Sequence, residues 1–593
     1  MVMKTQFKVF TRLFKKHFSR FLTIIAIVIV SVGFMSGAGK VEDQFNSAIN
    51  TVYVEKNVSD LIIKSKSNFG FKKNDISYFE DKFGKENISQ LMCYDLEDED
   101  TKDITRIFSY SFNDSNINKL ELIEGNFPSN SNEIVAEEKT HYIEGYSIGE
   151  KVEIMGKEYT VSGVVRNPLL IYTEEEPSFL DQDKYITHAI YVDSKPIIAT
   201  DIYVTLTDRT LFNSYSENYE EYIDNLKNEI KTELSEDKVE VLTLYENVGL
   251  YSLFKYGEKI GLIAAVVVLF FLLVTLLVVY STMTRLLDEE RGQIACLKTL
   301  GFSNFKITNK YVLFVFTATI IGGLLSFGVG VLLTQAIYFA MNANFKMPAF
   351  VLSNNHNYFL IVLAIIVLST SILTLLTGLK NINKKPVELL APKMARSGKK
   401  VLIERIPFIW NRLSFKYKST CRNVFLFKSR LLMTVISIMG SYVLVIAGFA
   451  VLDNCIDLPD AKSIFAIAIA IVCFSAALSL LVIYNLTNIN ISERNREIAT
   501  LMVLGYHDDE VSGYIFREIY IMSFIGVICG IPVGVAFVDF ILKYIDFGTL
   551  DEVNWWSWII APLITMSFSF LSTLLLRSKI TNTNMDESLK IRE

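Results

Sequence analysis

The chain has few of the side chains that cross-link a fold covalently or hold a metal ion. Its 593 residues include six cysteines and five histidines. Only Cys93 lies in the large polar segment 40–255, so a disulfide framework is not expected. The histidines are scattered and match no metal-ligand spacing. The sequence also lacks a Gly-x-x-x-x-Gly-Lys-Ser/Thr phosphate loop, a nucleophile elbow and a His-Glu-x-x-His motif. We therefore predict no metal site, no directly bound cofactor and no catalytic residue.

Charge is nearly missing from eight long stretches of the chain. The composition is 51% hydrophobic with a mean hydropathy of +0.33, which is too apolar for an ordinary soluble protein of this size. Each stretch has the roughly 20 residues needed to cross a hydrocarbon core. We predict transmembrane helices at 21–39, 259–283, 311–338, 358–379, 431–452, 464–487, 518–541 and 556–576. The first is long for a signal peptide and has a poor cleavage site, so we expect an uncleaved anchor.

Basic residues are unevenly distributed, and their distribution predicts the orientation. Six of them precede the first span, and the linker 381–430 is also basic. Because basic loops stay in the cytoplasm, both termini of an eight-span chain should be cytoplasmic. We thus expect a multi-pass protein of the plasma membrane with one large segment, 40–256, outside. That segment is strongly acidic although the net charge is only −6. The acidity either keeps an exported domain soluble or attracts cations or cationic peptides.

An internal repeat relates two parts of the chain. Residues 290–302 align with 494–506 at an offset of 204 positions. The same offset aligns small residues in the apolar segments that follow: Gly322, Ser326 and Gly330 with Gly526, Gly530 and Gly534. A membrane protein with two similar halves is usually a transporter or a related machine.

The two aligned loops are candidate docking elements on the cytoplasmic side. Each combines charged residues with an amphipathic Ile-Ala-x-Leu-x-x-Leu-Gly run, whose glycine fits a helix C-cap. A short helix of this kind can fit a groove on a soluble partner, or it can be a plain connector on lipid headgroups. We favour docking because the pattern occurs twice. The candidate docking residues are Glu290, Arg291, Ile294, Leu297, Leu300, Gly301, Glu493, Arg494, Glu497, Ile498, Leu501, Leu504 and Gly505.

The small-residue stripes predict close helix packing. Glycine and serine at every fourth position let two helix backbones approach each other. The contact is either static packing or a moving interface. Pro532 is expected to kink the seventh span, and Asp539 is placed where its carboxylate can reach water.

The outer segment is predicted to be a mixed α/β domain. We expect strands at 61–63, 202–206 and 239–244, helices at 75–83 and 210–234, and a hairpin turning at Gly156 within 151–166. The acidic run 95–100 lacks the spacing of a calcium loop and is expected to be a solvated turn. The segment has enough apolar strand faces for a core of its own.

The chain resembles the FtsX-like ABC transporter permeases with a MacB-type outer domain. The two aligned loops carry this resemblance, together with Lys385-Pro386-Val387-Glu388-Leu389-Leu390 after the fourth span. In the outer segment, residues 122–128, 132–135, 148–152 and 159–165 resemble the MacB core, and 409–414 and 418–423 resemble the mid-chain linker of two-unit permeases.

The resemblance implies a function and a partner. A separate ATPase subunit similar to LolD or MacB, in two copies, would bind ATP and Mg and dock under both loops. Its closure would move the spans and the outer domain, and so export or extract a lipid, a lipoprotein or a peptide. The alternative is a mechanotransmitter that transports nothing and regulates a cell-wall hydrolase. We expect contact with the lipid bilayer and no nucleic-acid partner. The second half has no outer domain, which departs from a symmetric outer chamber.

We therefore predict an α-helical integral membrane protein with two FtsX-like units and one mixed α/β extracytoplasmic domain. Its parts are an amphipathic helix 1–20, the first span 21–39, a MacB-like domain 40–256, permease unit 1 at 257–380, a basic linker 381–430, the fifth span 431–452, a short outer loop 453–463, permease unit 2 at 464–577 and a cytoplasmic tail 578–593.

Overall fold

The chain divides into two compact units in a computed structural model. The helical unit comprises Met1–Lys40, Ile260–Ile337 and Asn355–Glu593, and the outer unit comprises Val41–Lys259 and Tyr338–Asn354. The structure describes residues 11–67, 69–98, 101–112, 116–140, 142–171, 177–181, 183–206, 217–390, 404, 407–412, 414–426, 428–456, 462–545 and 548–581.

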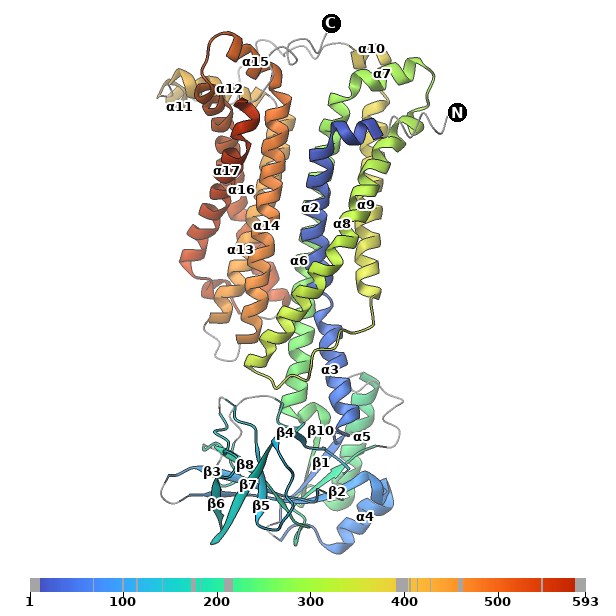
Figure 1. Cartoon of the computed structure of the whole chain (residues 1–593), viewed down its shortest axis with the longest axis vertical. Coiled ribbons are helices and arrows are strands. Elements are labelled where there is room, and N and C mark those ends of the chain that lie inside the picture. The colour runs from blue at the N-terminus through green and yellow to red at the C-terminus, as the bar shows by residue number, and fades with distance from the viewer. Residues whose placement is uncertain are drawn as a thin grey trace. The chain divides into compact units, whose positions relative to one another are not determined.

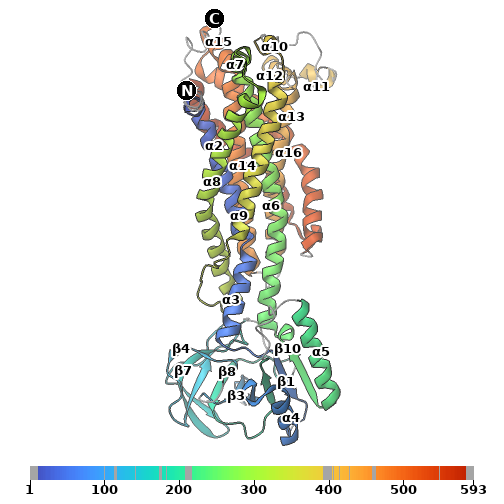
Figure 2. The ribbon, with the colours of Figure 1, turned by 90° about the vertical axis from the view of Figure 1, so that its right-hand side faces the viewer.

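Long apolar helices make up the helical unit (Figures 1 and 2). The described residues contain eight helices that are long and apolar enough to cross a membrane, which confirms the predicted fold class. The long helices are α2 (Phe18–Ala38), α6 (Val248–Glu289), α8 (Asn304–Ala340), α9 (Asn357–Ile382), α13 (Lys428–Ile456), α14 (Lys462–Glu493), α16 (Asp508–Ile545) and α17 (Trp555–Thr581). The short ones are α7 (Arg291–Thr299), α10 (Pro386–Leu390), α11 (Pro407–Arg412), α12 (Phe415–Leu426) and α15 (Asn495–Val503).

The repeat in the sequence is also a repeat in the structure. Helices α6 and α14 end at Glu289 and Glu493, and the short helices α7 and α15 then begin at Arg291 and Asn495. All of these boundaries differ by the same 204 positions as the aligned sequences. Two halves result: α2 with α6–α9, and α13 with α14–α17.

The small-residue stripes lie where α8 meets α2 and where α16 meets α13. A Cβ built on Gly322 would lie 3.0 Å from the carbonyl oxygen of Ile25, and one built on Gly526 would lie 2.9 Å from the Cβ of Ile438. Gly530 and Gly534 face Tyr442 in the same way, Gly330 faces Ser36, and Ser326 is fully buried. In both halves, glycine therefore allows the third long helix, α8 or α16, to pack closely against the first, α2 or α13. Pro532 lies inside α16, and Asp539 pairs with Lys543 one turn away at 2.8 Å.

The outer unit is built on a mixed β-sheet. Among its described residues the strands follow the order β10-β1-β9-β2-β3-β8-β5-β7-β4, with β6 paired to β7. The strands are β1 (Leu61–Ser65), β2 (Ile88–Glu97), β3 (Ile104–Tyr110), β4 (Glu121–Gly125), β5 (Glu133–Glu137), β6 (Lys151–Ile154), β7 (Lys157–Arg166), β8 (His188–Asp193), β9 (Asp201–Val204) and β10 (Val239–Thr243). The helices are α3 (Val41–Glu55), α4 (Lys73–Phe83) and α5 (Glu217–Leu234).

The predicted hairpin forms between β6 and β7. Met155 and Gly156, at its turn, have φ values of 50° and 79°. Two successive positive φ angles are what a two-residue turn with the twist of a hairpin requires, and glycine adopts them without strain. The register pairs Ile154 with Lys157.

Two features of the outer unit differ from the sequence prediction. Asp95 belongs to β2 and is buried, because Arg106 on the adjacent β3 pairs with it at 2.7 Å, so this part of the acidic run is not a solvated turn. Residues 338–354 were expected within permease unit 1, but they pack with the outer unit. We call residues 341–354, which connect α8 to α9, the strap.

Candidate functional site

Helices α7 and α15 end in the same backbone motif. In α7 the amide of Phe302 donates to the carbonyl of Leu297 at 3.1 Å, and Gly301 donates to Lys298 at 3.0 Å. In α15, Tyr506 donates to Leu501 at 3.1 Å and Gly505 donates to Met502 at 3.0 Å. This bond pair is the Schellman motif, which needs a residue at positive φ. Gly301 and Gly505 supply it, with φ of 85° and 88°.

Each short helix has buried and exposed residues, and each is followed by an exposed leucine. Ile294 and Ile498 are buried against their own half, so neither side chain is free to contact a partner. Leu297 and Leu501 are half-buried. Leu300 is 74% exposed and Leu504 is 69% exposed. Glu497, in the first turn of α15, is also exposed. Two equivalent leucines thus stand out at the end of the helical unit where Figure 1 shows α7 and α15, which we call the short-helix end.

In the first half, Glu290 anchors the start of α7. Its carboxylate accepts hydrogen bonds from Lys16 at 2.7 Å and from the ring of His17 at 3.1 Å, just before α2. Burial alone would raise the pKa of Glu290, but these donors lower it to about 2. The side chain is therefore ionised at neutral pH and holds α7 to the N-terminal segment. Arg291 and Lys298 hold the other side of α7 by donating to backbone carbonyls of α10 and the end of α9.

In the second half the anchor has the opposite sign. The residue equivalent to Glu290 is Arg494, whose guanidinium pairs with Glu518 of α16 at 2.6 Å. Both side chains are 3% exposed. The pair is a charge-assisted hydrogen bond in a buried place, so it orients the start of α15 strongly.

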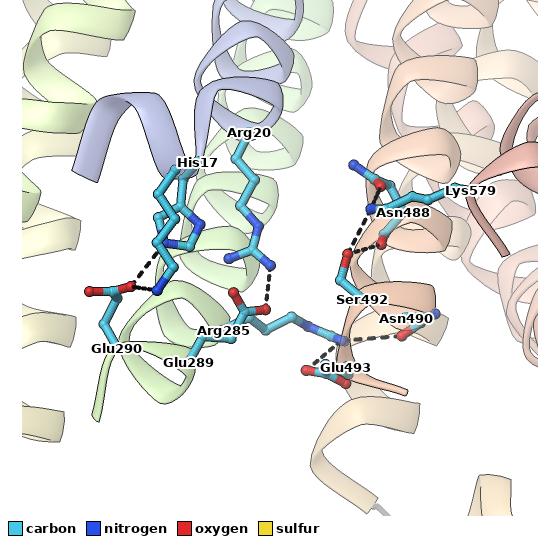
Figure 3. Close-up of polar contacts among 11 residues, drawn as sticks. His17, Arg20, Arg285, Glu289, Glu290, Asn488, Asn490, Ser492, Glu493 and Lys579 are labelled. Atoms are coloured by element: carbon cyan, nitrogen blue, oxygen red, sulfur yellow. Dashed lines mark hydrogen bonds and ion pairs between the residues drawn. The ribbon is translucent and has the colours of Figure 1, made fainter. Parts of the chain in front are cut away.

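One ion pair crosses between the halves (Figure 3). Arg285 of α6 pairs with Glu493 at the end of α14 at 2.9 Å and also donates to Asn490 at 3.2 Å. Further along the same helices, Asn485 donates to Thr282 at 2.9 Å. Within the first half, Arg20 pairs with Glu289. Glu289 and Glu493, the last residues of α6 and α14, are thus each held by an ion pair.

Comparison with known families agrees with this arrangement of two equivalent halves. The FtsX-like permease C-terminal family matches the chain twice, at residues 265–386 and 469–585. Two stretches of the chain, one in each half, are therefore similar to FtsX-like permeases. Both matches contain a short helix and its Schellman motif. The first also contains residues 338–354 of the outer unit, but neither includes the β-sheet of that unit. No curated protein matches the chain. Permeases of this family are membrane subunits of ABC transporters, which work with a separate ABC ATPase.

Sequence reasoning missed the residues that anchor the short helices. His17, Arg285 and Glu518 carry or can carry charge inside or next to apolar spans. A charge in such a place usually has a partner, and that signal could have identified Arg285 and Glu518. Glu290 and Arg494 were predicted as docking residues, but both are buried and paired within the chain. Their contribution to any docking is to position α7 and α15.

A buried ion pair also holds the strap within the outer unit. Lys346 of the strap pairs with Glu137 of β5 at 2.6 Å, and both side chains are buried. Glu137 also accepts from the hydroxyl of Tyr191 at 2.9 Å and from the backbone amide of Asn167. Burial raises the pKa of Glu137, although the charge of Lys346 opposes the rise. The strap is further held by Gln44, which donates to the carbonyl of Val351 and accepts from the amide of Ser353.

Proposed function

We propose that the chain is the permease subunit of an ABC exporter or extractor, driven by a separate ATPase of the LolD or MacB type. Two ATPase copies would dock on α7 and α15, one under each half. Closure of the ATPases on ATP would move the spans and, through them, the outer unit. The cargo would be a lipid, a lipoprotein or a peptide taken up outside the plasma membrane. The short-helix end and both termini would then face the cytoplasm.

The observation that carries this proposal is the pair of equivalent short helices. Each has nine residues, a buried charged anchor at its start and an exposed leucine near its end. A lever needs both properties, because the exposed end must contact a moving partner and the anchored end must pass the movement on. A plain connector between spans needs no buried anchor.

The strap supports a mechanical role for the outer unit. The chain enters this unit through α3 and leaves it into α6, and the strap adds a third covalent route between α8 and α9. Lys346 and Gln44 fix the strap on the outer unit through buried or half-buried polar contacts. A displacement of α8 or α9 therefore has a direct path into the sheet at β5.

The proposal is tested by co-purification and hydrolysis. The chain is co-expressed with a LolD/MacB-type ATPase of the same genome, and the complex is placed in lipid discs. We expect a stable complex with ATP hydrolysis that lipids or peptides stimulate. A correctly inserted chain that recovers no ATPase would contradict the proposal.

A variant lacking residues 45–250 separates transport from assembly. It should still bind the ATPase but should lose stimulated hydrolysis. If a cell-wall hydrolase rather than any lipid or peptide stimulates the wild-type complex, the non-transporting mechanotransmitter is the correct function.

A further inference from the structure

The internal repeat leads us to expect that a polar contact between the two halves occurs twice. Arg285 of α6 pairs with Glu493 of α14 at 2.9 Å (Figure 3). At the offset of 204 positions, the equivalent contact would join residue 489 to Glu289. Residue 489 is an isoleucine that is 1% exposed, and Glu289 instead pairs with Arg20 of its own half. This ion pair therefore has no counterpart in which the second half supplies the cation.

The neighbouring hydrogen bond between the halves is one-sided as well. Asn485 of α14 donates to the hydroxyl of Thr282 at 2.9 Å. The repeat places Ser281 and Leu486 at the equivalent positions, and a leucine side chain has no polar group to share. Thr282 and Arg285 are three positions apart, so they lie on the same face of α6. The end of α14 is thus held on one face of one helix of the first half.

Arg285 is fixed firmly enough to pass on a movement. It is 5% exposed, and its Nη1 atom donates to Glu493 and, at 3.2 Å, to Asn490. Both acceptors lie in the last turn of α14, immediately before α15. Hydrogen bonds between charged groups are strong and directional. Apolar contacts also join the halves, for example between Phe270 of α6 and Phe537 of α16, but the hydrophobic effect has no direction.

The two helices that Arg285 joins lead to different parts of the chain. Helix α6 is one uninterrupted helix of 42 residues, which begins in the outer unit and ends immediately before α7. Helix α14 follows α13 after a short segment and ends immediately before α15. A movement of α7 can thus reach the outer unit along the helix that precedes it. A movement of α15 must first cross to the first half, and Arg285 makes that crossing at the last residue of α14.

We propose that Arg285 couples the second half to the outer unit, so that the two short helices act on this unit by unequal routes. The inference rests on the proposed function, in which an ATPase docks on each short helix. The movement of α7 passes directly into α6, whereas the movement of α15 passes through Glu493 and Arg285 into the same helix. Arg285 is a positioning residue, because it is buried and acts through α6.

The test compares hydrogen exchange of β1 and β10 with and without ATP and vanadate, in the full chain bound to the co-expressed ATPase in lipid discs. R285M removes the cation, and E493A removes its partner from the side of α14. R285M/E493A completes a double-mutant cycle, which shows whether the two residues act as a pair. R20M is the matched control, because Arg20 is also buried and paired, but its partner Glu289 lies in the same half. Bound ATPase and the melting temperature are recorded for every sample.

We expect trapped ATP to change the exchange of β1 and β10 in the wild-type complex. R285M and E493A should bind as much ATPase but show a change about twofold smaller, since one of two inputs is uncoupled, and R285M/E493A should lose no more than either. R20M should lower the melting temperature and keep the change.

Two further outcomes separate this inference from the proposed function. A full change in R285M and E493A, or an equal loss in R20M, would overturn the inference and leave the proposed function standing. A wild type that binds no ATPase would contradict the proposed function, and the inference would fall with it. If a single variant does not fold, R285M/E493A decides, because it leaves neither charge of the pair without its partner.

Discussion

The two halves of the helical unit share a backbone but not its chemistry. Helices α7 and α15 have the same length, the same Schellman motif and the same offset from their neighbours. Yet the residue that anchors α7 is the acid Glu290, and the residue that anchors α15 is the base Arg494. The comparison shows that a glycine at positive φ and an apolar stripe define the element. The anchoring residue can be acidic or basic, provided that its partner carries the opposite charge.

The two halves differ more at the ends of the helices away from α7 and α15. The first half carries the outer unit between α2 and α6, whereas the second half joins α13 to α14 through a short segment. If both short helices dock an ATPase, as proposed, two inputs act on one outer unit. Four experiments would break or sharpen this picture.

The largest effect should follow from charging both exposed leucines. In L300D/L504D the apolar end of each short helix becomes anionic, so we expect loss of ATPase co-purification. The single variants should each lose about half of the bound ATPase if the halves are equivalent docking sites. F408D is the control, because Phe408 of α11 is also exposed and apolar but lies outside both loops. Normal recovery with L300D/L504D would reject both helices as docking elements.

The next effect concerns the outer unit, which only the first half has. K346M removes the cation beside Glu137, and breaking a buried pair in this way costs about 3–5 kcal/mol. K151M, in an exposed pair with Glu158, should cost less than about 1 kcal/mol. Hydrogen exchange of β5 and β8 is the measurement, because all four tryptophans lie outside the outer unit.

The pH dependence of K346M follows from the raised pKa of Glu137. A carboxyl whose pKa in the folded state lies above its ordinary 4.5 favours folding when protonated. Without Lys346 the pKa rises further, so the defect should grow as the pH increases past the pKa of Glu137 in the wild-type protein, which lies above 4.5. Adding Glu137→Gln to K346M should recover part of the stability. An equal defect at all pH values would show that the strap is held by packing and not by charge.

Substitutions at the packing glycines should affect the two halves in the same way. G322A and G526A each place a methyl group about 3 Å from backbone or Cβ atoms of the facing helix. We expect each to destabilise the helical unit by about 1–3 kcal/mol, the usual cost of overpacking. G328A is the control, since a Cβ there meets nothing within 4 Å. A lower melting temperature for only one of the two variants would show that the stripes pack differently.

The smallest effect should appear at low pH and in the first half alone. Because the pKa of Glu290 is about 2 instead of 4.5, its contribution to stability is complete above about pH 4.5 and is lost as pH falls toward 2. The difference in melting temperature between wild type and E290Q should therefore shrink across that window. E497Q, at an exposed site of α15, should change the melting temperature little. A difference that stays constant with pH would contradict the ionised anchor.

Patterns within short windows predicted much of this structure. The apolar stretches and the repeat predicted eight long helices and the two short ones, because these signals depend on local periodicity. The hairpin at Gly156 and the helix at Asp75 were also readable, since turn and helix chemistry is local. Gly301 and Gly505 predicted the ends of α7 and α15 for the same reason.

Contacts between residues far apart in the chain could not be predicted from the sequence. Glu137 ends a strand whose three middle residues are apolar, and its partner is 209 positions away in a loop with little charge. The burial of Asp95 could not be predicted from the acidic run, because only the pairing of β2 with β3 brings Arg106 opposite it. Glu290 and Arg494 looked like surface charges of a loop, and only the fold shows that each is buried beside a counter-ion.

The pairing of β1 with β10 has a consequence for how the outer unit could have been gained or lost. Leu61 lies opposite Thr243, so the chain enters and leaves the sheet on neighbouring strands. A segment whose ends lie side by side can be inserted into a loop or excised from it with little change to the host. The strap is not part of that segment. Excision would remove Glu137 and leave Lys346 in the remaining chain. Excision of the outer segment would therefore leave Lys346 without its counter-ion.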